Sequence, residues 1–183
     1  MKIAVVGKGN VGGGLAERWE RAGHEVTRIG KEGGDASEAE AVLIAVPGGA
    51  VASALEVVSG LEGKTVIDAT NLVGAAPPDG HGSNAAFVKS RTGGPTAKAF
   101  NINFASLYDR LDAARAGPGN LWAGDEEARA TVERLSADAG YEAIRVGDLD
   151  SAGAQEAAIG LVFAINRAGL GPFVYRMAAP EQL

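Results

Sequence analysis

The stretch that decides the fold reads Lys2-Ile3-Ala4-Val5-Val6-Gly7-Lys8-Gly9-Asn10-Val11-Gly12-Gly13-Gly14. Its first part, Ile3 to Val6, is an unbroken apolar run rich in β-branched residues, which predicts a strand buried on both faces. The glycines after it have the spacing G-x-G-x-x-G, and an amphipathic helix follows, with Leu15 and Trp19 facing inward. A strand, this spacing and a helix in that order predict a dinucleotide-binding unit.

Each glycine has a separate role in this prediction. Gly7 makes the tight turn, Gly9 lets the backbone approach a pyrophosphate, and Gly12 lets the helix pack close to the strand. We expect the anion to rest on backbone N–H groups at the positive end of the helix dipole. The alternative is a glycine-rich turn without a ligand. The residues predicted to surround the pyrophosphate are Gly7, Lys8, Gly9, Asn10, Val11 and Gly12.

The composition limits the classes of function. The chain has 183 residues, of which 46% are hydrophobic and 22% charged, as expected for one globular domain. A net charge of −6 without a basic run argues against nucleic acid as a partner. The lack of cysteine excludes disulfides and thiolate catalysis, and it favours the cytoplasm. No run reaches the ~20 apolar residues of a membrane span, and Met1-Lys2 begins a strand rather than a signal peptide.

Strand and helix patterns alternate along the chain, which predicts a doubly wound α/β fold of Rossmann type with a mainly parallel sheet. With no linker visible, we expect one NADP-binding domain over 1–183, made of a dinucleotide-binding core (1–148) and a C-terminal helical appendage (149–183). The expected strands are 3–6, 25–29, 41–46, 65–69, 97–101, 121–123 and 141–146. After the first helix, the expected helices are one turn at 36–40, then 49–59, a helix to 91 capped by Ser83, a helix to 139 capped by Asp125, and 150–168.

The end of the second expected strand decides between NAD and NADP. In NAD-binding proteins an acidic residue there binds the ribose 2′-hydroxyl, whereas a nearby cation receives the 2′-phosphate of NADP. The strand ends in Ile29-Gly30-Lys31-Glu32, so Gly30 leaves room where a carboxylate would project, and Lys31 can meet a phosphate. We therefore predict NADP. The alternatives are a Glu32 side chain that turns inward, as for NAD, and a Lys31 that is only a solvated loop residue.

Polar and apolar residues at the carboxyl ends of the later strands are candidates for the nicotinamide side of the site. Val46-Pro47 ends the third expected strand, and Pro47 can lay a flat apolar edge along a cofactor. Asn71 and Asn101 follow the next two strands and carry amides that can pair with a carboxamide or a ribose hydroxyl. The alternative for both asparagines is a turn-capping role.

The titratable residues predict no catalytic or metal-binding group. His24 precedes a strand and is expected to be structural, while His81 lies in a long loop and is at most a lid residue. Asp68 lies inside an apolar strand, where a carboxylate must be paired or protonated, and structural anchoring is the favoured role. Hydride transfer between two bound cofactors depends on orientation rather than on a proton relay, so this absence is consistent with it.

Several stretches together resemble one known family, the coenzyme F-420-dependent NADP oxidoreductases, which use an 8-hydroxy-5-deazaflavin. The similarity extends over most of the chain. Its stretches are Gly7-Lys8-Gly9-Asn10-Val11-Gly12, Gly23-His24-Glu25-Val26, Ala45-Val46-Pro47, Val66-Ile67-Asp68-Ala69-Thr70-Asn71, Ala97-Lys98-Ala99-Phe100-Asn101, Ala123-Gly124-Asp125, Asp138-Ala139-Gly140-Tyr141 and Gly169-Leu170-Gly171-Pro172-Phe173.

The resemblance implies an enzyme that transfers hydride between NADP(H) and coenzyme F-420 or a flavin-like acceptor. It implies NADP held at the pyrophosphate by Gly9, Asn10 and Val11, with Lys31 as the basic 2′-phosphate residue beside Gly30. Val46, Pro47 and Asn71 would lie toward the nicotinamide, the deazaflavin would stack under the last helix, and the chain would form a homodimer.

Two other functions stay open from the sequence. One is a non-catalytic NADP-binding sensor or subunit, which would bind nucleotide without turning over any acceptor. The other is a reductase of another small substrate, such as a β-hydroxyacid or an imine. Such reductases complete their substrate pocket with a long helical second domain, for which the residues after Val146 are too few.

Overall fold

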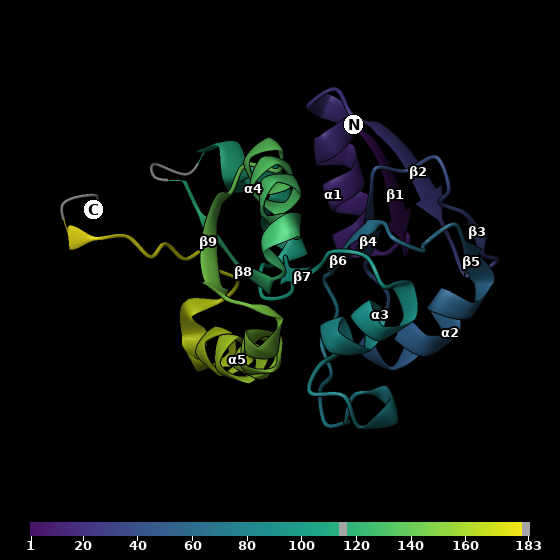
Figure 1. Ribbon diagram of the computed structural model, residues 1–183. Coiled ribbons are helices and arrows are strands. Elements are labelled where there is room, and N and C mark those ends of the chain that lie inside the picture. The colour runs from purple at the N-terminus through teal and green to yellow at the C-terminus, as the bar shows by residue number, and fades with distance from the viewer. Residues whose placement is uncertain (114–116, 181–183) are drawn as a thin grey trace.

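The described residues of the computed structural model, 1–113 and 117–180, form a Rossmann-type α/β fold, as the sequence predicts (Figure 1). Its seven-stranded sheet has the order β2-β1-β4-β6-β7-β8-β9. Only β7 and β8 pair antiparallel, while the other neighbours in this sheet are parallel. The strands are β1 (Lys2–Val6), β2 (Glu25–Ile29), β4 (Ala41–Ile44), β6 (Thr65–Asp68), β7 (Thr96–Ala99), β8 (Gly119–Gly124) and β9 (Glu142–Gly147).

Helices cover both faces of the sheet, which explains why β4 is apolar and buried at every position. α1 (Asn10–Arg21) and α4 (Arg129–Asp138) share one core with alternate residues of β1 and β4, and the Trp19 indole N–H donates to the Leu135 carbonyl at 2.8 Å. α2 (Val51–Val57) and α3 (Asn84–Thr92) bury the other face. As predicted, the Ser83 hydroxyl caps α3 by accepting from the Ala86 amide at 3.0 Å.

The connection between β2 and β4 differs from the prediction. No helical turn forms at 36–40, and the segment instead contains β3 (Gly34–Asp35), which pairs with β5 (Val58–Ser59) in a small second sheet. The Asp35 carboxylate accepts from the Ser37 amide at 2.9 Å and from the Ser59 hydroxyl at 3.1 Å. Such local side-chain bonds compete with a helix, and β5 shortens the helix predicted over 49–59.

Several other strand boundaries and one predicted helix cap also differ from the predictions. Phe100, with φ of 61°, ends β7 before the predicted end at Asn101. The Asp125 side chain does not cap the segment that leads into α4, because its carboxylate accepts from the Lys89 ammonium at 2.7 Å and from the Thr96 amide at 2.8 Å. The Asp125 side chain therefore links α3 to β7 instead of capping the helical segment that follows it.

The C-terminal part packs against β7 and β8. α5 (Ala152–Ile165) continues into a wider helical turn, Asn166–Leu170. The extended tail after it first runs beside β8, where the Gly119 amide donates to the Tyr175 carbonyl at 2.6 Å, and then leads away from the body (Figure 1). α5 leaves Leu161 65% and Phe163 36% exposed. Among the described residues, no helix has the length and apolar character that crossing a bilayer requires.

Candidate functional site

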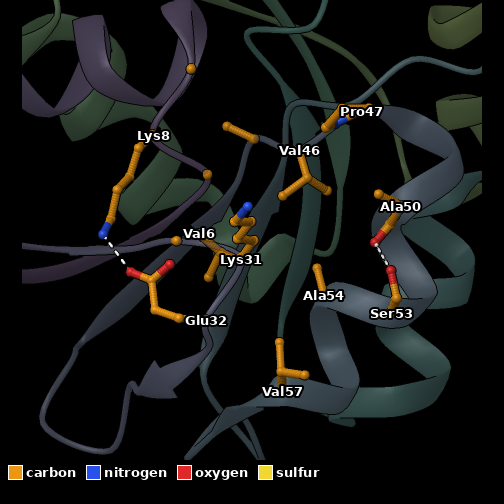
Figure 2. A pocket seen from close by; sticks show the side chains of 14 residues that line it. Val6, Lys8, Lys31, Glu32, Val46, Pro47, Ala50, Ser53, Ala54 and Val57 are labelled. Atoms are coloured by element: carbon orange, nitrogen blue, oxygen red, sulfur yellow. Dashed lines mark hydrogen bonds and ion pairs between the residues drawn. The ribbon is translucent and has the colours of Figure 1, made fainter.

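A cleft of about 580 Å³ opens at the carboxyl ends of β1 and β4 (Figure 2). The chain leaves β1 toward β2 on one side and then returns to β4 on the other, so this is the point where the strand order reverses. Ligands of open α/β sheets bind in the crevice at such a point. The residues that line it are Val6, Gly7, Lys8, Gly9, Gly30, Lys31, Glu32, Ala45, Val46, Pro47, Ala50, Ser53, Ala54 and Val57.

The backbone conformation and close packing of the chain require glycine at two of the three motif positions. Gly7 has φ of 114°, and a Cβ on it would lie 2.3 Å from the Ala45 carbonyl oxygen. A Cβ on Gly12 would lie 2.0 Å from the Gly7 carbonyl oxygen, so a side chain there would push α1 away from the turn. The predicted roles of Gly7 in the turn and of Gly12 in close packing agree with these contacts.

Gly9 differs from the other two, because a Cβ built on it meets nothing within 4 Å. Its backbone lines the cleft and forms the N-cap of α1, which has no side-chain cap and no acidic residue in its first turn. The first N–H groups of a helix have no partner within the helix, and the dipole makes this end positive. The residues present thus fit a pyrophosphate over Gly9, as the motif predicts.

Charged side chains gather at the β2 end of the cleft. The Lys8 ammonium donates to Glu32 at 2.7 Å and so bridges the loops that follow β1 and β2 (Figure 2). This hydrogen bond lowers the pKa of the Glu32 carboxyl from its ordinary value. Lys31 lines the same cleft, so two cations and one anion surround the place predicted for the adenosine ribose.

The opposite wall of the cleft is apolar. Val46 and Pro47 line it, and α2 adds a stripe that was not predicted. The spacing of this stripe is helical, which is the signal that could have found it. Its residues are Ser53, Ala54 and Val57, and Ala50, the residue just before α2, extends it.

Four predicted site residues do not line this cleft. Asn10 faces a separate cleft of about 490 Å³ between α1 and the 3₁₀ segment Ala105–Ala113, and Val11 and Gly12 line neither. The Asn71 amide donates to the Asn101 carbonyl at 2.5 Å and accepts from the Asn101 amide at 2.8 Å. A nicotinamide contact for Asn71 stays a prediction.

A buried ionic cluster lies beside the carboxyl end of β6. The Lys98 ammonium donates to Asp68 at 2.7 Å, to Glu156 at 2.6 Å and to the Thr70 carbonyl at 2.6 Å. The side chains of Lys98 and Asp68 are fully buried, and that of Glu156 is 7% exposed. Asp68 is thus an anchor, as expected, and Glu156 fastens α5 to the sheet. Sequence reasoning missed Lys98 and Glu156.

The pH dependence of stability should report on this cluster. Burial raises the pKa of the Glu156 carboxyl above its ordinary value of 4.5, against the opposing effect of Lys98, while Asp68 adds to the rise. A carboxyl with a raised pKa binds more protons in the folded state, so the stability it contributes is lost as pH rises.

We therefore expect wild type to lose stability relative to Glu156→Gln as pH rises above 4.5. Urea unfolding of both proteins at several pH values checks this. A difference in unfolding free energy that stays constant with pH would contradict it.

The two histidines lie outside the cleft. The ring of His24 is buried, and its Nε2 lies 2.7 Å from an Asp138 carboxylate oxygen, in agreement with a structural role. His81 Nε2 lies 3.3 Å from the Ser90 hydroxyl, and its ring packs edge-on against Phe87. The described residues contain no group of His, Asp or Glu side chains able to hold a metal ion.

Known structures share this fold. A protein of Arthrobacter sp. FB24, provisionally named an F420-dependent NADP reductase, matches with a TM-score of 0.82 and 23% identity over 98% of this chain and 100% of its own. A hypothetical protein from Sinorhizobium meliloti matches with a TM-score of 0.65 and 23% identity over 84% of this chain and 88% of its own.

Longer enzymes match as well. A reductive aminase from Aspergillus terreus, in complex with NADPH and ethyl levulinate, has a TM-score of 0.67 and 19% identity. The match covers 92% of this chain but 62% of the aminase. No protein-family model matches the sequence, and no curated protein matches it. Since the identities are this low, the similarity establishes the fold. The family resemblance seen in the sequence is therefore supported for the fold.

Proposed function

We propose that the chain is an NADP(H)-dependent oxidoreductase that transfers hydride between the nicotinamide and a deazaflavin, coenzyme F-420, or a flavin-like acceptor. The observation that carries the proposal is the Gly9 backbone, which lines a cleft at the strand-order reversal beside the uncapped end of α1. NADP(H), when bound, would supply or accept the hydride.

Each wall of the cleft would have one task. The uncapped N-terminus of α1 would bind the pyrophosphate, and Lys8 and Lys31 would bind the 2′-phosphate. Val46 and Pro47 would orient the cofactor and exclude water. These tasks need no proton donor, which is consistent with hydride transfer to a second bound ring.

A comparison with a known protein supports the proposed acceptor. A protein provisionally named an F420-dependent NADP reductase shares the fold over its whole length. The reductive aminase, which binds NADPH, matches over 62% of its own length and supports NADP(H) as the cofactor.

Mixing the protein with NADPH and oxidised coenzyme F-420 should bleach the deazaflavin absorbance, and FMN and FAD serve as alternative acceptors. Bleaching that depends on both protein and NADPH supports the proposal. Tight NADPH binding without turnover of any acceptor would contradict it, and would support the binding-subunit alternative.

A homodimer is part of the same proposal. A second copy would cover exposed apolar side chains on α5, on the turn after it and on the tail. They are Leu161, Phe163, Leu170, Val174 and Met177, which are 36–65% exposed.

A further inference from the structure

The carboxylate of Glu32 lies where a side chain at the end of β2 would project. A Cβ built on Gly30 would lie 2.4 Å from Glu32 Oε2 and 2.7 Å from Oε1. In dinucleotide-binding sheets, the side chain at this place meets the 2′-position of the adenosine ribose. Glu32 thus reaches the 2′-subsite from two residues further along the chain.

Lys8 is the one side chain described that hydrogen-bonds Glu32, and backbone N–H groups of Glu32 and Gly30 also interact with its carboxylate. The two partners come from different loops, and their side chains are 49% and 63% exposed. An ion pair this exposed contributes little to stability, so either partner can exchange it for another at small cost. The Glu32 carboxylate is charged at neutral pH, and its hydrogen bond with Lys8 lowers the pKa of this carboxyl further.

A 2′-phosphate would meet opposing charges at this place. Lys8 and Lys31 attract it, and both line the cleft that also holds Glu32. The Glu32 carboxylate repels it and occupies the same space next to Gly30. NADP(H) therefore cannot enter this subsite with Glu32 in its present position, whereas a ribose 2′-hydroxyl is neutral and smaller.

We propose that Glu32 is a specificity-determining residue that occupies the 2′-phosphate subsite in the free protein as the internal counterion of Lys8. NADP(H) binds by displacing this carboxylate, and Lys8 exchanges it for the phosphate. The inference rests on the proposed function only in assuming that the cleft binds dinucleotides. It assigns to Glu32 a selective role against the 2′-phosphate.

Calorimetric titration with adenosine 2′,5′-bisphosphate and with 5′-AMP tests the proposal, because the two ligands differ only in the 2′-phosphate. We expect Glu32→Gln to bind the bisphosphate on the order of tenfold more tightly than wild type, with 5′-AMP unchanged. Lys8→Met should weaken binding of the bisphosphate more than that of 5′-AMP. Glu38→Gln is the matched control, since it removes one charge from an exposed pair with Lys2 outside the cleft.

Each other outcome overturns the inference. If Glu32→Gln weakens 5′-AMP, the carboxylate binds the ribose hydroxyls, as in NAD-binding proteins. If Glu32→Gln changes the affinity for neither ligand, or has the same effect as Glu38→Gln, Glu32 has no selective role. Neither of these results argues against the dinucleotide site. If neither wild type nor any variant binds 5′-AMP, the bisphosphate, NADPH or NADH, the proposed function is wrong as well.

Discussion

Replacing Lys98 by methionine is expected to lower the free energy of unfolding by about 3–5 kcal/mol. The substitution keeps most of the side-chain volume but removes the only ammonium described between Asp68 and Glu156, two carboxyls that water hardly reaches. An unpaired buried charge is far more costly than the loss of an exposed one. Equilibrium unfolding in urea at neutral pH measures the change.

Two further variants make this result specific. Lys2→Met breaks an exposed pair with Glu38 and should change the unfolding free energy by less than about 1 kcal/mol. Combining Lys98→Met with Asp68→Asn and Glu156→Gln removes all three charges and should recover much of the loss. A Lys98→Met protein as stable as Lys2→Met would show that the cluster does not hold α5 to the sheet.

Replacing Gly12 by alanine is expected to weaken NADPH binding about 100-fold. The new Cβ would lie 2.0 Å from the Gly7 carbonyl oxygen, which is backbone and cannot turn aside. α1 must therefore move away from the turn, so its first N–H groups no longer point at the pyrophosphate. Losing two hydrogen bonds to a charged group, at about 1.5 kcal/mol each, corresponds to this factor. Calorimetric titration measures it.

The neighbouring glycine provides the matched control. A Cβ on Gly13 would lie 3.5 Å from the Lys8 carbonyl oxygen, an ordinary contact, so Gly13→Ala should bind NADPH nearly as wild type does. Alanine should also stabilise the helix there by about 0.5–1 kcal/mol. Equal affinities of Gly12→Ala and Gly13→Ala would contradict the role given to Gly12.

The fold was predictable where local signals and burial agree. The apolar run of β1, the glycine spacing and the Ser83 cap each depend on residues close together in sequence, and the structure has all three. The segment 36–40 has no such signal, and its conformation depends on pairing between β3 and β5, which are more than 20 residues apart. The predicted helical turn was therefore wrong.

The site was predictable in part for the same reason. The glycine motif identified Gly7 and Gly9, and the end of the second expected strand identified Lys31, because each signal depends on residues close together in sequence. The ionic cluster was not predictable, because Lys98 meets Glu156 from 58 residues away and nothing in the short strand around Lys98 indicates that pairing. The position of Glu32 over Gly30 depends likewise on Lys8, 24 residues earlier.

The central claim is that backbone amides at the start of α1 hold the diphosphate of a dinucleotide in the cleft between β1 and β4. Calorimetric titration of the wild-type protein with NADPH, and separately with NADH, tests it most directly. The account predicts saturable binding of NADPH at one site per chain. Folded protein that gives no heat of binding with either nucleotide, at any concentration up to the millimolar range, would contradict it.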